Sequence, residues 1–231
     1  MRIVKAALSV TAVVLLGWSG TAVASAETKC TDLKGTVDIT GQTCQIQAST
    51  PTYTMNISFP ALYPDEKSLM DYVTQTRDGF VNVAQTPSDR GMPYELDVTT
   101  TGYSSAVPPR GTQSVVFKTF QDVGGAHPQT FYKAFNWDQG LRKPITFDTL
   151  WAKTADPLPV IFPIVQADLQ KQSGLTNPIL PGTGLDPSHY QNFAVTNDAV
   201  IFFFSQGELL PEAAGATQVA VPRSAIDPMI A

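Results

Sequence analysis

Two stretches of the chain have the hydrophobic spacing of amphipathic helices. The first predicted helix runs from about Pro64 to Ala84, and its apolar stripe consists of Leu69, Tyr72, Val73, Phe80 and Val83. The second begins near Pro157 and continues to about Ser173, with Ile161, Val165 and Leu169 on one face. Gly174 follows directly, and glycine is the residue that most often ends a helix in the left-handed conformation.

Strand patterns occupy much of the remaining chain. The strongest hairpin surrounds Gly124 and Gly125, because long alternating runs of apolar residues precede and follow this pair. Strands and helices do not alternate in a regular βαβ rhythm, which favours an α+β fold: an antiparallel or mixed β-sheet with two main packed helices. The predicted strands cover residues 53–59, 94–103, 112–123, 130–137, 200–204 and 218–221.

Phe202, Phe203 and Phe204 form the most aromatic stretch of the sequence. Side chains alternate between the two faces of a strand, so three consecutive phenylalanines cannot all enter one core. We expect a central strand that is covered on both faces. The alternative is an aromatic binding patch, with one ring exposed.

The first residues have the pattern of a cleavable secretory signal peptide. Arg2 and Lys5 form a basic head, Ala6 to Leu16 is an apolar run, and Ala24-Ser25-Ala26 matches a small-x-small cleavage site. The apolar run is shorter than the roughly 20 residues that a membrane-spanning helix needs. We therefore predict cleavage after residue 26, a single secreted domain over residues 27–231, and no integral membrane span.

Charge and cysteine content narrow the classes of partner. The formal net charge is −5, and it becomes more negative once Arg2 and Lys5 are removed, which argues against a nucleic acid partner. Cys30 and Cys44 are the only cysteines, and in an exported chain they most economically form a disulfide. A metal site would need further ligands near them. We predict no metal and no cofactor, and we expect a monomer.

Histidine and serine limit the catalytic possibilities. His127 and His189 are the only histidines, and no G-x-S-x-G elbow occurs in the mature part of the chain. Ser104 and Ser105 are the nearest candidates for a nucleophile. His127 is either a ligand-facing base or a turn residue that bonds local backbone; His189 follows Asp186, which is placed to cap the start of a helix.

Several runs resemble the mycobacterial secreted immunogenic protein family. They are Tyr63-Pro64-Asp65, Pro108 to Thr112, Gly124 to Pro128, Tyr132 to Phe135, Pro144 to Leu150, Tyr190 to Asn197 and Gly207 to Gly215. The glycine turn and the C-terminal half are also similar to a lysozyme-sensing anti-sigma factor and to a domain of some secreted peptidoglycan deacetylases. The resemblance implies a secreted or cell-wall-associated α+β domain with a β-grasp-like element, known as an antigen. Some relatives are described as short-chain esterases.

Three functional hypotheses follow. The first is a secreted immunogenic protein that binds a host protein or a cell-wall glycan through the turn formed by Gly124, Gly125, His127 and Pro128. The alternative is a short-chain carboxylesterase, with Ser104 or Ser105 as nucleophile and His127 or His189 as base. A second alternative, implied by the resemblance, is a lysozyme-binding or glycan-binding module.

Overall fold

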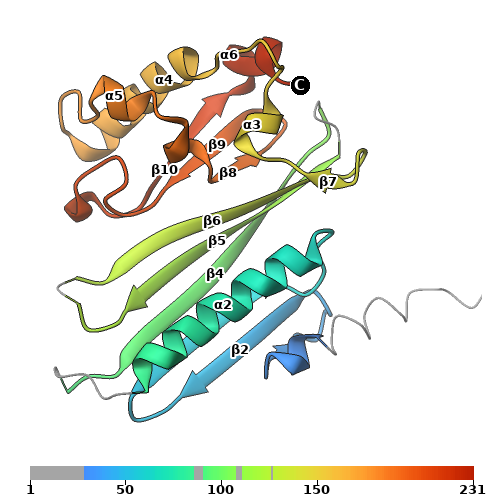
Figure 1. Ribbon diagram of the computed structural model, residues 1–231, viewed down its shortest axis with the longest axis vertical. Coiled ribbons are helices and arrows are strands. Elements are labelled where there is room, and N and C mark those ends of the chain that lie inside the picture. Colours follow the sequence, from blue (N-terminus) through green and yellow to red (C-terminus); the bar gives the residue numbers. More distant parts are fainter. Residues whose placement is uncertain (1–28, 86–90, 108–110, 126) are drawn as a thin grey trace, which may run out of the picture.

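The computed structural model describes residues 29–85, 91–107, 111–125 and 127–231. The predicted leader, residues 1–26, lies outside them. The strands of a seven-stranded sheet lie side by side in the order in which they occur in the chain. Neighbouring strands are antiparallel except β3 and β4. These two are parallel because helix α2 (Glu66–Ala84) carries the chain back between them (Figure 1). Its strands are β1 (Thr36–Val37), β2 (Thr43–Ser49), β3 (Tyr53–Pro60), β4 (Tyr94–Ser105), β5 (Thr112–Asp122), β6 (Gln129–Asp138) and β7 (Lys143–Pro144).

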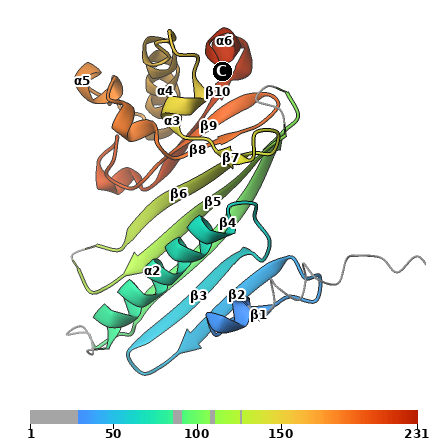
Figure 2. The ribbon, with the colours of Figure 1, turned by 45° about the vertical axis from the view of Figure 1, so that its right-hand side comes forward.

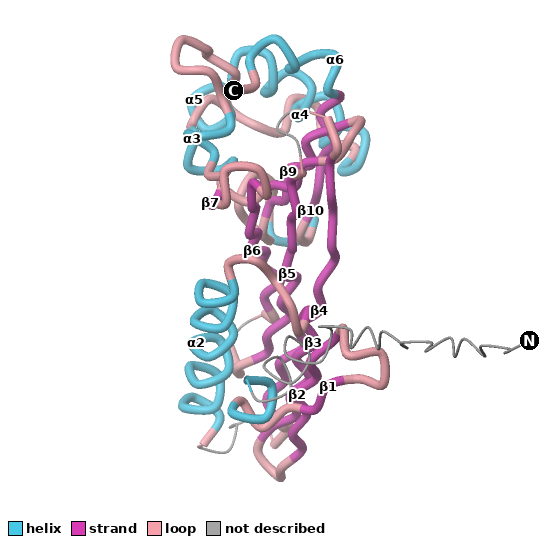
Figure 3. Tube along the Cα trace, turned by 90° about the vertical axis from the view of Figure 1, so that its right-hand side faces the viewer, coloured by secondary structure: helices cyan, strands magenta, loops and turns pink. Residues whose placement is uncertain are grey.

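Helix α2 covers one face of this sheet (Figure 3). The Asp65 side chain caps its first turn by accepting a hydrogen bond of 3.4 Å from the Ser68 backbone N–H. Leu69 and Phe80 of the predicted stripe are buried, whereas Val83 is 49% exposed and Ala84 is buried in its place. The prediction for Val83 was therefore wrong, because the last turn of the helix rotates a neighbouring position onto the sheet.

The disulfide between Cys30 and Cys44 is present, as predicted, with 5.7 Å between the Cα atoms. Both cysteines are buried in the core beneath α2. A β-carbon on Gly35 would lie 2.9 Å from both sulfur atoms, so the chain needs glycine where it passes the bridge. The bond joins the N-terminal segment to strand β2.

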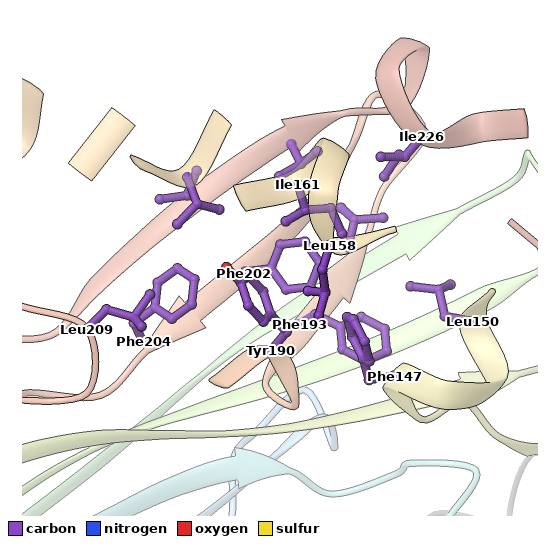
Figure 4. Close-up of a cluster of buried hydrophobic side chains, with 14 of the residues drawn as sticks. Phe147, Leu150, Leu158, Ile161, Tyr190, Phe193, Phe202, Phe204, Leu209 and Ile226 are labelled. Carbon is purple, nitrogen blue, oxygen red and sulfur yellow. The ribbon is translucent and has the colours of Figure 1, made fainter. Parts of the chain in front are cut away.

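A second, three-stranded sheet has the order β10-β9-β8 and packs against helix α4 (Leu158–Ser173). Gly174 ends α4 in the left-handed conformation, with φ of 73°, as the sequence predicted. Figure 4 shows Phe202 and Phe204 beside Tyr190 in the core beneath α4. The elements are β8 (Phe193–Val195), β9 (Ala199–Phe204), β10 (Thr217–Pro222), short helices α3 (Phe147–Leu150), α5 (Pro181–Gly184) and α6 (Arg223–Ile226), and 3₁₀ turns η1 (Pro187–Tyr190), η2 (Glu212–Ala214) and η3 (Asp227–Met229).

Phe203 points to the opposite face of β9 and joins the two sheets. It lies in a small cluster with Val116 of β5 and Ala194 of β8, and its ring contacts Tyr103 and Tyr132. All three phenylalanines are buried. The prediction of a strand covered on both faces is confirmed.

The α+β class with a mostly antiparallel sheet is also confirmed. The β-hairpin β2–β3, the crossing helix α2 and the parallel return strand β4 make up its β-grasp-like part. Each predicted strand and both main helices are present, with ends within a few residues of the prediction. Strands β1, β2, β7 and β8 and the short helices were not predicted, because they are too short or too polar to produce a clear hydrophobic period.

Candidate functional site

The tip of the β5–β6 hairpin is shaped by glycine. Gly124 has φ of 80°, a conformation that favours glycine, and its backbone N–H donates to Oδ1 of Asp122 at 3.0 Å. A β-carbon at Gly124 would lie 2.9 Å from Cε1 of Tyr94. At Gly125 the nearest atom to a β-carbon would be the His127 carbonyl oxygen at 4.0 Å. The turn therefore requires glycine at position 124, whereas Gly125 has free space around it.

Gln206 attaches the C-terminal part of the chain to the hairpin. Its side chain accepts from the Thr130 N–H at 3.1 Å and donates to the Pro128 carbonyl at 3.3 Å. Its own backbone N–H donates to the Thr130 carbonyl at 2.8 Å. One residue further back, Ser205 Oγ accepts from the Tyr132 N–H at 3.2 Å. These four bonds hold segment 205–206 against the first part of β6.

A hollow of about 520 Å³ lies between this hairpin and the C-terminal segment, and we call it the hairpin-tip pocket. His127 is exposed here, and Glu212 enters from the η2 turn. Gly207, with φ of 79°, leaves room for the Glu212 side chain, whose Cγ would lie 3.2 Å from a β-carbon at that position. The pocket is lined by Gln121, Val123, Gly125, His127, Gln129, Phe131 and Glu212.

The pocket thus contains two of the four residues of the predicted binding turn, Gly125 and His127. Gly124 lies beside it and shapes the turn, and the Pro128 carbonyl is bonded to Gln206. Another hollow, of about 540 Å³, lies at the end of α4, and the residues that line it, such as Leu175 and Leu210, include no titratable group. The hairpin-tip pocket combines an imidazole, a carboxylate, two amides and an aromatic ring.

His189 forms a separate imidazole–carboxylate pair. It ends the η1 turn, whose Asp186 cap accepts from the Ser188 N–H at 2.9 Å, as predicted. Its Nδ1 lies 3.7 Å from Oε1 of Glu208, and these side chains are 25% and 20% exposed. Burial raises the pKa of the Glu208 carboxyl, although hydrogen bonds from Ser205 and the charge of His189 act in the opposite direction.

The order of these groups differs from that of a serine hydrolase. The Glu208 carboxylate accepts from the Ser205 N–H at 2.6 Å and also faces His189. A catalytic triad has its imidazole between the serine and the acid. Here the Glu208 carboxylate lies between Ser205 and His189. Among the described residues, no serine hydroxyl is hydrogen-bonded to either imidazole.

Ser104 and Ser105 lie at the end of β4, away from both histidines. Ser105 is buried and donates to the Val107 carbonyl at 3.2 Å, with Oδ1 of Asn197 at 3.4 Å. It pairs with Thr112, the first residue of β5, whereas the hairpin tip follows the last residue of that strand. At the usual rise per residue, the two ends of β5 are about 30 Å apart. Asn197 precedes β9, whereas His189 and Glu208 lie near the far end of that strand. The structure therefore does not bring the four proposed catalytic residues together.

In the part of the chain that is described, no three His, Cys, Asp or Glu side chains are grouped so that they could hold a metal ion. Over the same residues, no helix is both long and apolar enough to cross a bilayer.

The fold is that of DUF3298 proteins. The family model "Protein of unknown function (DUF3298)" matches residues 148–224. A crystal structure of a DUF3298 family member from Bacteroides fragilis superposes with a TM-score of 0.53 and 14% sequence identity, covering 82% of this chain and 93% of that one. This likeness concerns the fold alone.

Sequence relatives identify the family. Immunogenic protein MPB64 of Mycobacterium bovis and immunogenic protein MPT64 of Mycobacterium tuberculosis are each 62% identical to this chain over 231 residues, the full length of both. The chain belongs to this mycobacterial immunogenic protein family. Esterase Rv3036c of M. tuberculosis is 53% identical over 229 residues, 99% of each chain. The peptidoglycan-N-acetylmuramic acid deacetylase PdaC of Bacillus subtilis is 23% identical over 162 residues, 69% of this chain and 33% of that protein.

Gln206, Glu208 and Glu212 are not among the residues predicted from the sequence. Nothing in a local pattern shows that residues 205–212 pack beside a hairpin some 80 positions earlier. The signal that was present is the run Gly207 to Gly215, in which two glycines with positive φ bracket both acids.

Proposed function

We propose that this protein is exported after removal of residues 1–26 and that its single domain, residues 27–231, binds a glycan of the cell wall in the hairpin-tip pocket. The observation that carries the proposal is the chemistry of that pocket. Gln121 and Gln129 offer amide donors and acceptors, Glu212 offers an acceptor, and Phe131 offers an apolar ring. Sugars present hydroxyl groups around an apolar ring face, so a site of this composition suits them.

The deacetylase relative adds indirect support, since its name places its substrate in peptidoglycan. The alternative ligand of the same pocket is a host protein. The resemblance to a lysozyme-sensing anti-sigma factor suggests lysozyme as that protein. The acidic charge of the chain would suit a basic partner of this kind.

Co-sedimentation with purified insoluble peptidoglycan tests the glycan proposal. We expect the mature protein to sediment in a saturable manner, and we expect His127→Ala and Glu212→Gln to weaken binding at least tenfold. Thr54→Ala, on an exposed position of β3, is the matched control and should bind as the unaltered protein does. Equal sedimentation of all four proteins, or none, would reject the pocket as a glycan site. Direct binding of lysozyme to the mature protein, measured without peptidoglycan, tests the alternative.

The second candidate function is hydrolysis of short-chain esters, favoured by the 53% identical relative that is named an esterase. Ser104→Ala, Ser105→Ala, His127→Ala and His189→Ala remove the residues proposed from sequence. The Ser205 side chain also interacts with Glu208, which adds Ser205→Ala as a fifth variant. Hydrolysis of p-nitrophenyl butyrate by the purified mature protein measures the activity. Activity that survives all five changes would exclude these serines and histidines as its source.

A further inference from the structure

Strand β4 is paired with β5 along almost its whole length, but with its other neighbour, β3, only over its first residues. Its pairing with β5 runs from Glu95 to Ser105. Its pairing with β3 runs only from Tyr94 to Val98; the last three residues of β3, 58–60, have no partner on β4, and β4 then continues past the end of β3 (Figure 2). Within the described ranges, no strand pairs with residues 99–105 on the side away from β5. Alternate residues of this stretch therefore direct backbone N–H and C=O groups toward an unpaired edge.

Residues 99–105 themselves do not carry the side chains that usually prevent a strand edge from pairing with another chain. The stretch reads Thr-Thr-Thr-Gly-Tyr-Ser-Ser, without a charge or a proline, and three of its residues are β-branched. Thr99, Thr101, Gly102 and Ser104 are exposed. Natural proteins normally protect an open edge with lysine, proline, a bulge or a covering segment. An open edge of seven such residues is a surface suited to accepting a strand.

A hollow of about 450 Å³ lies beside the same edge. One side of it is formed by Gln42, just before β2, by Thr43 of β2 and by Pro60 of β3. The β4 side is formed by Thr100, Gly102 and Ser104. All the side chains that line it are uncharged, and most carry an amide or a hydroxyl. Alternate side chains of a strand added to β4 would project toward this hollow.

We propose that residues 99–105 bind an extended, uncharged peptide by β-strand addition. Main-chain hydrogen bonds to the β4 edge supply affinity, and the hollow selects small polar side chains such as serine, threonine and glutamine at alternate positions. Seven residues span about 23 Å, enough for a short strand. A second copy of this chain fits less well than a separate peptide, because its own β4 would bring the attached β3 to the same edge.

The test uses a blocked synthetic heptapeptide of alternating threonine and glutamine, labelled with a fluorophore, and the anisotropy of its binding to the mature protein. Gly102→Lys is the informative variant. A β-carbon at Gly102 meets no atom within 4 Å and its φ is not positive, so the strand accepts a side chain, which then occupies the hollow. Thr54→Lys places the same charge on an exposed position of β3 and is the control. Gly102→Val repeats the steric block without charge.

We expect saturable binding that Gly102→Lys and Gly102→Val both weaken at least tenfold and that Thr54→Lys leaves unchanged. A peptide with alternate amide nitrogens methylated should not bind, and hydrogen exchange at residues 99–105 should slow when the unmethylated peptide is present. Absence of saturable binding would overturn the proposal, as would equal binding by Gly102→Lys and Thr54→Lys. Sedimentation that reveals a dimer abolished by Gly102→Lys would also overturn it, in favour of pairing between two copies.

Discussion

A β-carbon at Gly124 would lie 2.9 Å from Cε1 of Tyr94, so the tip of the β5–β6 hairpin and the start of β4 leave no space for a side chain between them. This contact packs the Gly124 turn against the first residue of β4. It also separates the roles of two adjacent glycines, because Gly125 faces free space and lines the hairpin-tip pocket.

Gly124→Ala should therefore lower the free energy of unfolding by about 1–3 kcal/mol, because alanine is strained at a positive φ and its methyl group meets the Tyr94 ring. Gly125→Ala is the matched control and should change stability by less than about 0.5 kcal/mol. Urea unfolding followed by circular dichroism measures both. Equal destabilisation by the two variants would contradict the assignment of different roles.

Gln206→Ala should lower the free energy of unfolding by about 1–3 kcal/mol, because the Pro128 carbonyl and the Thr130 N–H both lose their partner. Hydrogen exchange should accelerate locally at the Thr130 amide. Gln206→Glu keeps an acceptor for Thr130 but cannot donate to Pro128, so we expect an intermediate loss. Unchanged exchange at Thr130 in Gln206→Ala would show that this side chain does not hold the hairpin.

Glu208 should make stability depend on pH in the direction opposite to most carboxylates. Its pKa is raised in the folded state, mainly by burial, so the folded protein holds the proton more tightly than the unfolded chain. The stabilising contribution of this group is complete below the ordinary pKa of about 4.3 and is lost as pH rises through the higher folded-state pKa. Glu208→Gln should thus be at least as stable as the unaltered protein at pH 7. Its relative advantage should shrink as the pH is lowered to 4, measured by urea unfolding at each pH.

Replacing both cysteines, as in Cys30→Ala with Cys44→Ala, should lower the free energy of unfolding by about 3 kcal/mol, because the bridge joins residues 14 positions apart and restricts the unfolded chain. Thermal unfolding of the unaltered protein with and without dithiothreitol should reproduce the same loss. The reductant should have no effect on the double variant. A double variant as stable as the oxidised protein would show that the bridge contributes nothing to stability.

The hydrophobic pattern of the sequence was sufficient for the two main helices, the long strands and the glycine hairpin, because these features depend on residues close together in the chain. The burial of Phe202, Phe203 and Phe204 followed from the same reasoning, since a strand must alternate its faces. The pairing of Cys30 with Cys44 needed only the count of cysteines and the predicted export of the chain.

Tertiary structure alone decided which side chains meet. Glu212 lines the same pocket as His127, 85 positions earlier in the chain, and Gln206 bonds the start of β6, because sheet β10-β9-β8 packs onto β5 and β6 through Phe203. Ser105 and His127 appear close in the sequence, yet strand β5 holds them at opposite ends of the sheet. Such distances depend on how separate cores pack together, and no local period in the sequence records that packing.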